Sequence, residues 1–331
     1  MAGSKGRAVG NPAVHADATG WLNRRGFLRA AGLGVMGLVG GRSTSLGSPG
    51  ATITRRAERP NILLLMTDQQ RFDSLGCYGC RAVGTPNLDG LARAGALFEH
   101  CYSPNPICTP TRASLLTGKH IAGHGVYKLH DVLSKNEILL PERLGSAGYE
   151  TSLVGKLHVS GLWEEAERRH PHDGFEHYQW CIDPGLNFDS SFNAYARWVQ
   201  AKDPSFYERL TREGKSLRHF PPELHFSTWA AETTIEHITS RDTSRPFFIM
   251  MSLFDPHDPY YDHPLEAAKE VDPGEIPVPQ AAPDESSLPE GIRRERDKSQ
   301  RVLHRMPEYA GNLRKLRESN YTSIGFLDEQ I

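Results

Sequence analysis

The sequence lacks an excess of charge of either sign. Its 331 residues carry 38 Lys and Arg against 40 Asp and Glu, a formal net charge of −2. Nucleic-acid-binding proteins normally show a strong basic excess, so this balance argues against a nucleic-acid partner. Aromatic residues are also few, at 9%, but the hydrophobic share of 38% is ordinary for a globular protein. A chain of this length can bury a core in one large domain or two small ones.

No hydrophobic run is long enough to cross a membrane. The uncharged run at residues 30–41 has twelve residues, whereas a spanning helix needs roughly 20. It follows the pair Arg24-Arg25, and residues 1–50 together carry a net charge of +5. Basic residues, a short apolar run and then small residues are typical of a signal peptide, here of the twin-arginine kind. The alternative is a Gly-rich leader in which the arginine pair is accidental.

The leader implies a route of export. We expect residues 1–50 to be a signal peptide and linker, and the twin-arginine translocase to be a partner. The protein is then expected to be periplasmic or secreted, with no stable membrane span once the signal is removed.

Cysteine is scarce. The five cysteines are an odd number, which leaves at least one thiol outside any intramolecular pair. Cys77 and Cys80 have the spacing of a redox or metal-binding pair, but no second such pair or compact His/Cys cluster accompanies them. We interpret them as structural or unpaired, with a thiol-redox role as the alternative.

The order of apolar segments predicts an α/β fold. Residues 60–66 and 247–254 are continuously apolar, as expected of strands that are buried on both faces of a parallel sheet. Residues 160–225 are rich in aromatics and proline without clean periodicity, which favours a variable insertion. The other predicted elements are strands at 96–101 and 149–154, helices at 85–95, 109–118, 137–147, 226–241 and 307–331, and a Pro- and acid-rich loop at 264–288.

One short segment combines a nucleophile with an anion site. In residues 108–112, Pro110 favours the first turn of a helix and so places Cys108 just outside the helix N-terminus. Free backbone N–H groups and the helix dipole favour anions at that point. Arg112, one turn further on, adds a cationic fork that suits a tetrahedral oxyanion. The alternative is a helix-start cysteine beside a surface arginine.

Further candidates follow the predicted strands. Asp68 and Gln69 offer oxygen ligands for a hard cation such as calcium, unless Asp68 only caps a turn. Lys156 and His158, spaced i and i+2, share a face and supply a fixed positive charge and a candidate proton donor. His257 follows the second apolar strand, and only that position distinguishes it from an ordinary surface histidine.

These residues lie in motifs that resemble the sulfatase family of the alkaline-phosphatase-like superfamily. The resemblance implies a mixed, mostly parallel sheet flanked by helices, with a sulfatase amino-terminal catalytic domain over residues 58–331. It also implies hydrolysis of the sulfate ester of a small molecule or a saccharide. The matching segments occur in the family's order, at residues 60–69, 85–89, 108–118, 148–158 and 245–257.

The resemblance implies a modified nucleophile and a metal ion. Cys108 matches the position that a separate maturation enzyme converts to formylglycine, whose hydrate attacks sulfur and forms a covalent sulfated intermediate. Asp68, Gln69 and the oxygen of the modified Cys108 match the ligands of one divalent ion, usually Ca²⁺. Many family members have Asp at both metal positions, so Gln69 lowers the negative charge of the site by one.

The remaining roles and one departure also come from the resemblance. Arg112, Lys156 and His158 match groups that orient the nucleophile, bind sulfate oxygens and assist the leaving alcohol. His257 and Lys156 match substrate-binding positions. The family's other metal ligands and a further lysine are expected after residue 331, and the predicted helix 307–331 carries no stop signal. We therefore expect a C-terminally truncated chain that binds calcium weakly and turns over little or no substrate.

Two other functions stay open. A phosphonate or phosphate monoester hydrolase uses the same kind of site, and Gln69 is compatible with it. A non-catalytic relative that binds sulfate esters is the second, although the intact Cys108 and Arg112 argue against it. Aromatic residues are predicted to shape the substrate pocket, with core packing as the alternative; they are Trp163, Phe175, Tyr178, Trp180 and Tyr195.

Overall fold

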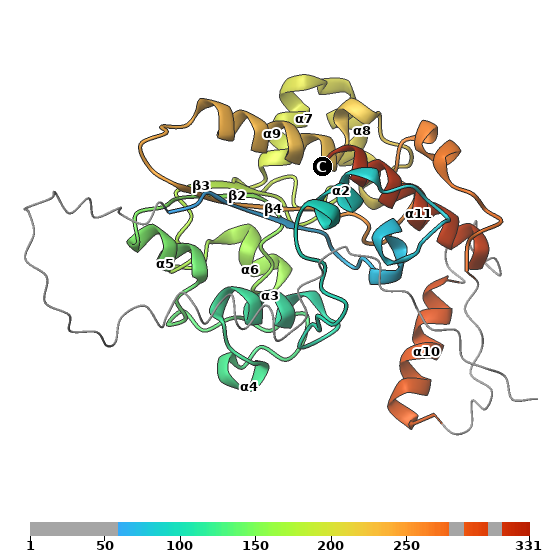
Figure 1. The fold of residues 1–331 in the computed structure, drawn as a ribbon, viewed down its shortest axis with the longest axis horizontal. Helices are drawn as coiled ribbons and strands as arrows, with labels where there is room; N and C mark the ends of the chain where they lie inside the picture. Colours follow the sequence, from blue (N-terminus) through green and yellow to red (C-terminus); the bar gives the residue numbers. More distant parts are fainter. Residues whose placement is uncertain (1–58, 278–287, 304–312) are drawn as a thin grey trace, which may run out of the picture. The chain divides into compact units, whose positions relative to one another are not determined.

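A four-stranded parallel sheet forms the centre of the fold (Figure 1). The computed structural model describes residues 59–277, 288–303 and 313–331. The strand order is β1-β4-β2-β3, with β1 Ile62–Met66, β2 Glu150–Gly155, β3 His177–Trp180 and β4 Phe247–Ser252. The α-helices are α2 Pro86–Ala94, α3 Cys108–Thr117, α4 Ile121–His124, α5 Leu140–Ser146, α6 Leu162–Glu167, α7 Ala194–Lys202, α8 Pro204–Glu213, α9 Phe226–Ser240, α10 Glu290–Leu303 and α11 Leu313–Glu329. Short 3-10 helices are η2 Phe72–Ser74, η3 Gly76–Tyr78, η4 Gly214–Ser216, η5 Pro222–Leu224 and η6 Leu265–Glu270.

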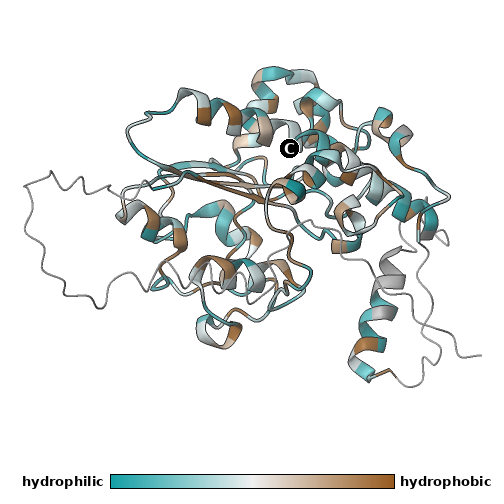
Figure 2. Cartoon of the chain, viewed as in Figure 1, coloured by the Kyte–Doolittle hydropathy of each residue, from teal (hydrophilic) through white to brown (hydrophobic). Residues whose placement is uncertain are grey.

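Helices cover both faces of the sheet. In Figure 1, α7, α8 and α9 lie above the sheet, and α3, α5 and α6 lie below it. Successive residues of β4 point to opposite faces, so Met251 packs with Phe226 and Trp229, while Met250 packs with Leu116. Figure 2 shows hydrophobic residues concentrated along the strands between the two helical layers. This two-sided burial explains the apolar run of β4.

The main elements predicted from the sequence are confirmed. All residues of β4 are buried, as its apolar run indicates. β2 is buried throughout as well, although it begins with three polar residues. The prediction of burial on both faces is wrong for β1, whose residues are half-buried or exposed because it has a neighbour on one side only among the described strands. The register pairs Leu64 and Leu153 with the two sides of Met250. Pro86 begins α2 with Thr85 as its N-cap residue, and Gly118 ends α3 in the left-handed conformation. The fold is α/β, with a parallel sheet flanked by helices.

One prediction about secondary structure is wrong. Residues 96–101 form no strand, because no strand of the described structure lies beside them and β-structure needs a pairing partner. The segment 160–225, for which the sequence favours a variable insertion, contains α6, β3, α7 and α8. Trp180 and Tyr195 from this segment are fully buried in the core. Its aromatic residues lack periodicity because short elements alternate within it.

Several predictions fall partly or wholly outside the described residues. The predicted leader at 1–50 lies wholly outside them. So do residues 278–287 of the predicted loop 264–288 and residues 307–312 of the predicted helix 307–331. Of the predicted last helix, α11 occupies Leu313–Glu329. Helix α10 has no counterpart among the elements predicted from the sequence. Within the described residues, none of the helices is both long and apolar enough to span a membrane.

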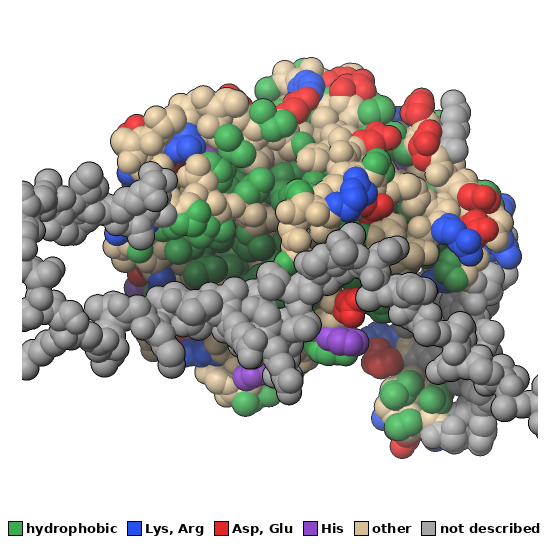
Figure 3. Space-filling model, in the orientation of Figure 1, with side chains coloured by type: hydrophobic (Ala, Val, Ile, Leu, Met, Phe, Trp, Pro, Cys, Tyr) green, Lys and Arg blue, Asp and Glu red, His purple; other side chains and the backbone are tan. Residues whose placement is uncertain are grey.

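One edge of the sheet is apolar and accessible. Among the described strands, β1 has a neighbour on one side only, and Leu63 on this strand is 42% exposed. Figure 3 shows hydrophobic side chains gathered over the sheet on the face that is drawn. Such an edge presents backbone groups to which another strand can pair.

Candidate active site

The carboxyl ends of β1, β2 and β4 bring the predicted site residues together. Asp68 follows β1, Lys156 follows β2, and His257 lies in the segment after β4. Backbone bonds join these segments: Asp68 N donates to Asp255 O at 3.1 Å, and Lys156 N donates to Ser252 O at 2.9 Å. Ligands of open α/β sheets bind at this edge, which makes it the expected place for a functional site.

A buried charge cluster lies at this edge. Lys156 Nζ is 2.7 Å and Arg112 Nη2 is 3.0 Å from the same carboxylate oxygen, Asp68 Oδ2. The other guanidinium nitrogen of Arg112, Nη1, donates to Lys156 O and to Ser252 Oγ, both at 2.8 Å. The guanidinium is therefore fixed by three hydrogen bonds, one of them to a charged group.

The cluster carries one more positive than negative charge. Burial alone raises the pKa of Asp68, but the charges of Lys156 and Arg112 outweigh that effect and lower it to about 2. The carboxylate is thus ionised at neutral pH and neutralises only one of its two cationic neighbours. The residual positive charge favours an anion beside the cluster.

A cavity of about 510 Å³ opens beside the charge cluster. Cys108 is the first residue of α3, with Ile107 as the N-cap residue, so the prediction that it precedes the helix is wrong by one position. It nevertheless lies at the helix N-terminus, where backbone N–H groups favour anions. Five predicted site residues line this cavity, together with Ser103, Asn105, Thr111 and others; the five are Asp68, Gln69, Cys108, Arg112 and His257.

Lys156 and His158 are buried, and neither is among the residues that line the cavity. His158 Nε2 is 3.1 Å from Thr109 Oγ1, and that hydroxyl donates to Leu129 O at 3.0 Å. The hydroxyl must therefore accept from His158, which places the ring proton on Nε2. Burial, followed by the charges of Lys156 and Arg112, lowers the pKa of His158 to about 2, so the imidazole is neutral.

His257 is held by aromatic packing and by its own loop. Its ring lies 4.7 Å from that of Phe254, and Lys156 Nζ lies 5.4 Å from the Phe254 ring. His257 Nδ1 contacts the backbone oxygen of Asp258. The structure thus joins this lone histidine to the site through Phe254.

Known proteins are similar to this chain. Residues 60–331 match the family model described as Sulfatase. The chain belongs to the sulfatase family. An arylsulfatase from Clostridium perfringens is 33% identical over 212 residues, which cover 61% of this chain and 44% of that protein. An N-acetylglucosamine-6-O-sulfatase from Bacteroides thetaiotaomicron is 30% identical over 200 residues, which cover 60% of this chain and 31% of that protein.

The sulfatase-family chain spans less than half the length of these two relatives. The solved structure of the phosphonate monoester hydrolase of Agrobacterium radiobacter is similar in fold, with a TM-score of 0.61. The match covers 82% of this chain and 57% of that one, at 21% sequence identity. At that identity the likeness shows the fold alone, which is the alkaline-phosphatase-like α/β fold expected from the sequence.

The predicted metal ligands of the sulfatase site offer two oxygen atoms. Gln69 has a φ of 59° and donates from Nε2 to Tyr260 Oη at 3.0 Å. Among the described residues, Gln69 Oε1 and Asp68 Oδ1 accept no hydrogen bond, so both are available to a hard cation. Asp68 is the only carboxylate among the residues that line the cavity. Because Ca²⁺ takes six to eight oxygens, these residues fit part of a calcium site.

Sequence reasoning missed Glu165, a buried carboxylate that shapes the loop after β2. Its Oε1 accepts from Val159 N at 2.6 Å and Ser160 N at 3.0 Å. Its Oε2 accepts from His158 N at 2.8 Å and Trp180 Nε1 at 3.2 Å. His158 has a φ of 56°, so this bonding holds it in a left-handed conformation. No local signal distinguishes this glutamate from a surface residue of a short helix.

The aromatic residues predicted to shape the sulfatase pocket do not line the cavity. Trp180, Tyr195 and Phe175 are buried in the hydrophobic core, and Trp163 is 65% exposed. The alternative interpretation, core packing, is therefore the correct one for the buried aromatics. Most of the residues that line the cavity have polar side chains instead, and among them Gln70 Nε2 is buried without a hydrogen-bond partner in the described part of the chain.

Proposed function

We propose that the whole protein hydrolyses organic sulfate esters with a formylglycine at position 108. The observation that carries this proposal is the placement of Cys108 at the N-terminus of α3, in the same cavity as Arg112 of the charge cluster. Converted to formylglycine, this position supplies an aldehyde hydrate whose hydroxyl is the nucleophile toward sulfur.

The residues of this chain provide the charge for that reaction. The guanidinium of Arg112 is fixed before substrate arrives, by bonds to Asp68, Lys156 and Ser252. A preorganised cation costs no reorganisation when negative charge develops on the sulfate oxygens. His257, on the opposite loop of the cavity, is the candidate contact for the substrate. The neutral His158 positions the α3 N-terminus through Thr109.

A divalent ion, Ca²⁺ in the sulfatase resemblance, is part of the proposal. Asp68 and Gln69 would hold it through their free oxygens, beside position 108. Bound there, the ion would act as a Lewis acid on oxygen. Because Lys156 and Arg112 already neutralise Asp68, the ion must compete with them, which favours weak binding to these residues alone.

The substrate, partners and location are also proposals. The named relative that acts on N-acetylglucosamine 6-O-sulfate favours a saccharide sulfate ester, with other small sulfate esters open. Maturation requires a formylglycine-generating enzyme, and export uses the twin-arginine translocase and delivers the protein to the periplasm or outside the cell. Changing Arg24-Arg25 to Lys-Lys is expected to retain the protein in the cytoplasm. Unchanged export of this variant would contradict the leader assignment.

The activity is tested on matched substrates. The whole protein, produced with a formylglycine-generating enzyme, is assayed on an aryl sulfate and on the corresponding aryl phosphonate ester. Hydrolysis of the sulfate that is lost in Cys108→Ala supports the proposal. Preference for the phosphonate ester favours the second candidate, a phosphonate or phosphate monoester hydrolase. Gln69 keeps this candidate open because a site with Gln69 carries one negative charge fewer than a site with two aspartates. Binding of the sulfate without turnover would identify a non-catalytic relative.

A further inference from the structure

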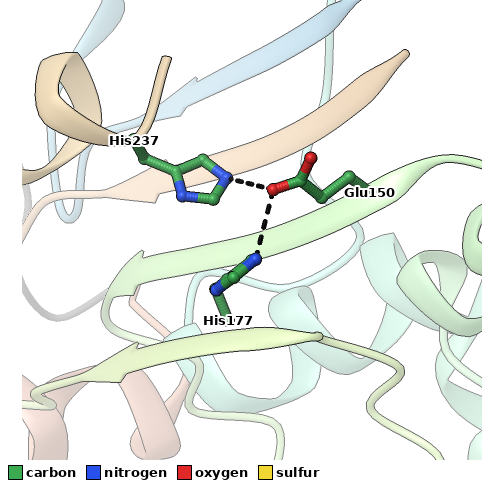
Figure 4. A group of neighbouring side chains, drawn as sticks. All are labelled: Glu150, His177 and His237. Atoms are coloured by element: carbon green, nitrogen blue, oxygen red, sulfur yellow. Dashed lines mark ion pairs between the residues drawn. The ribbon is translucent and has the colours of Figure 1, made fainter. Parts of the chain in front are cut away.

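A second cluster of metal-ligating side chains lies at the opposite edge of the sheet. Glu150 is the first residue of β2, His177 is the first residue of β3, and His237 lies in the last turns of α9. The candidate active site lies at the carboxyl ends of the strands, whereas this cluster lies at their amino ends. Figure 4 shows both imidazole rings directed toward the carboxylate of Glu150.

The three side chains converge on one point. Glu150 Oε1 is 3.1 Å from His177 Nε2 and 3.2 Å from His237 Nε2. All three ligand atoms lie within 4.8 Å of one another. In a tetrahedral zinc site with bonds of about 2.0–2.1 Å, neighbouring ligand atoms are about 3.3 Å apart. The separations of the two imidazole nitrogens from the carboxylate oxygen therefore need little change to accept an ion.

The surroundings provide another oxygen and a route from solvent. Ser152 Oγ lies 2.8 Å from His237 Nε2, and Ser152 is the register partner of His177. A cavity of about 210 Å³ reaches His177 and His237. The side chain of Glu150 is 9% exposed and that of His177 is 49% exposed, so the carboxylate is shielded while one ligand remains accessible. Burial, followed by the charge of His177, lowers the pKa of His237, which favours the neutral imidazole.

We propose that Glu150, His177 and His237 bind one divalent transition-metal ion of the zinc class. Two imidazoles and one carboxylate suit zinc, whereas the all-oxygen set beside Cys108 suits a hard cation such as calcium. The two sites are therefore separable by metal type. The ion joins α9 to the first residues of β2 and β3, so it stabilises the contact between this helix and the sheet. The reaction at Cys108 does not require it.

The direct test is zinc binding to the 331-residue chain. The chain is stripped with a chelator, dialysed into excess Ca²⁺ to occupy oxygen sites, and titrated with Zn²⁺ by calorimetry. One equivalent is expected to bind. Because an ion that binds only the folded state stabilises it, the unfolding midpoint should rise by about 5–11 °C at a free Zn²⁺ concentration 100 times the dissociation constant. Co²⁺ should give the visible absorption of a four-coordinate nitrogen and oxygen site.

Variants separate this site from other histidines. His177→Asn and His237→Asn should each weaken Zn²⁺ binding by at least about 10²-fold and remove the shift in the unfolding midpoint. His172→Asn is the matched control. His172 Nδ1 lies 3.1 Å from both carboxylate oxygens of Glu142, but no second histidine in the described part of the chain shares that carboxylate.

The outcomes decide the proposal. The proposal is overturned if the chain binds no Zn²⁺ ion in the titration. It is also overturned if His172→Asn and His177→Asn lose Zn²⁺ binding equally. If the variants fail to fold, the Co²⁺ spectrum of the unchanged chain decides, and a six-coordinate spectrum contradicts the site.

Discussion

Replacing Asp68 with Asn tests the buried charge cluster. The change keeps the shape of the side chain but leaves Lys156 and Arg112 without their shared counter-ion, at atoms that are now 2.7 and 3.0 Å from the carboxylate. The pKa of Asp68 falls from 3.8 to about 2 in the folded protein, which corresponds to about 2.5 kcal/mol of stability. Breaking a buried ion pair costs about 3–5 kcal/mol. We expect Asp68→Asn to cost about 3 kcal/mol.

The pH dependence has a definite sign. Because the pKa of Asp68 is lowered on folding, its contribution is complete above the unfolded value of 3.8 and is lost as pH falls through about 2. The difference in stability between the unchanged chain and Asp68→Asn should therefore be constant near neutral pH and should narrow below pH 4.

The assay is urea unfolding of both chains in the presence of a chelator, with thermal unfolding alongside. A loss of about 3 kcal/mol corresponds to a fall in the midpoint of about 6–12 °C. A double-mutant cycle with Lys156→Met assigns the effect to the pair, with an expected coupling of about 2 kcal/mol. A midpoint within about 1 °C of the unchanged chain, or a coupling near zero, would refute the electrostatic reasoning.

Three further predictions follow from other contacts. Glu165→Gln keeps one acceptor oxygen but turns an amide toward backbone donors, so it should cost about 2–4 kcal/mol in urea unfolding. An unchanged midpoint would contradict the role of Glu165 in holding the loop after β2. Asp328→Ala removes the carboxylate that accepts from two N–H groups at the start of α2, so it should lower the free energy of unfolding by about 1–3 kcal/mol. A loss below about 0.5 kcal/mol would contradict a stabilising contact between α11 and α2 through Asp328. Burial and, second, the charge of Asp89 raise the pKa of Cys77, which disfavours the reactive thiolate. Replacing Cys77 and Cys80 with Ala should therefore leave sulfate-ester hydrolysis by the whole protein unchanged. A loss of activity would revive the redox role.

The sequence predicts the site well where residues follow buried strands. Continuous apolarity identifies β1 and β4, and parallel strands necessarily bring their carboxyl ends to one edge. Asp68 and His257 could therefore be placed together without knowledge of any contact, and both line the cavity. Pro110 similarly predicts the start of α3 to within one residue.

The sequence predicts poorly where side chains act across long separations. Glu165 forms bonds that depend on the left-handed conformation at His158, and no local pattern reports that conformation. His158 was expected to share one face with Lys156 and to donate a proton, but its left-handed backbone conformation directs its ring to Thr109. The burial of Trp180 could not be predicted from the sequence. The helices and strand in 160–225 are each too short to show a hydrophobic periodicity.

Mass spectrometry of the peptide that contains Cys108 tests the central claim most directly. The chain is produced with a formylglycine-generating enzyme, together with a substrate that this enzyme is known to convert, and the aldehyde is trapped with a hydrazide. The account predicts formylglycine at position 108 and an unmodified thiol in cells without the maturation enzyme. A thiol at Cys108 while the companion substrate is converted, or full sulfate-ester hydrolysis by the unmodified protein, would contradict it.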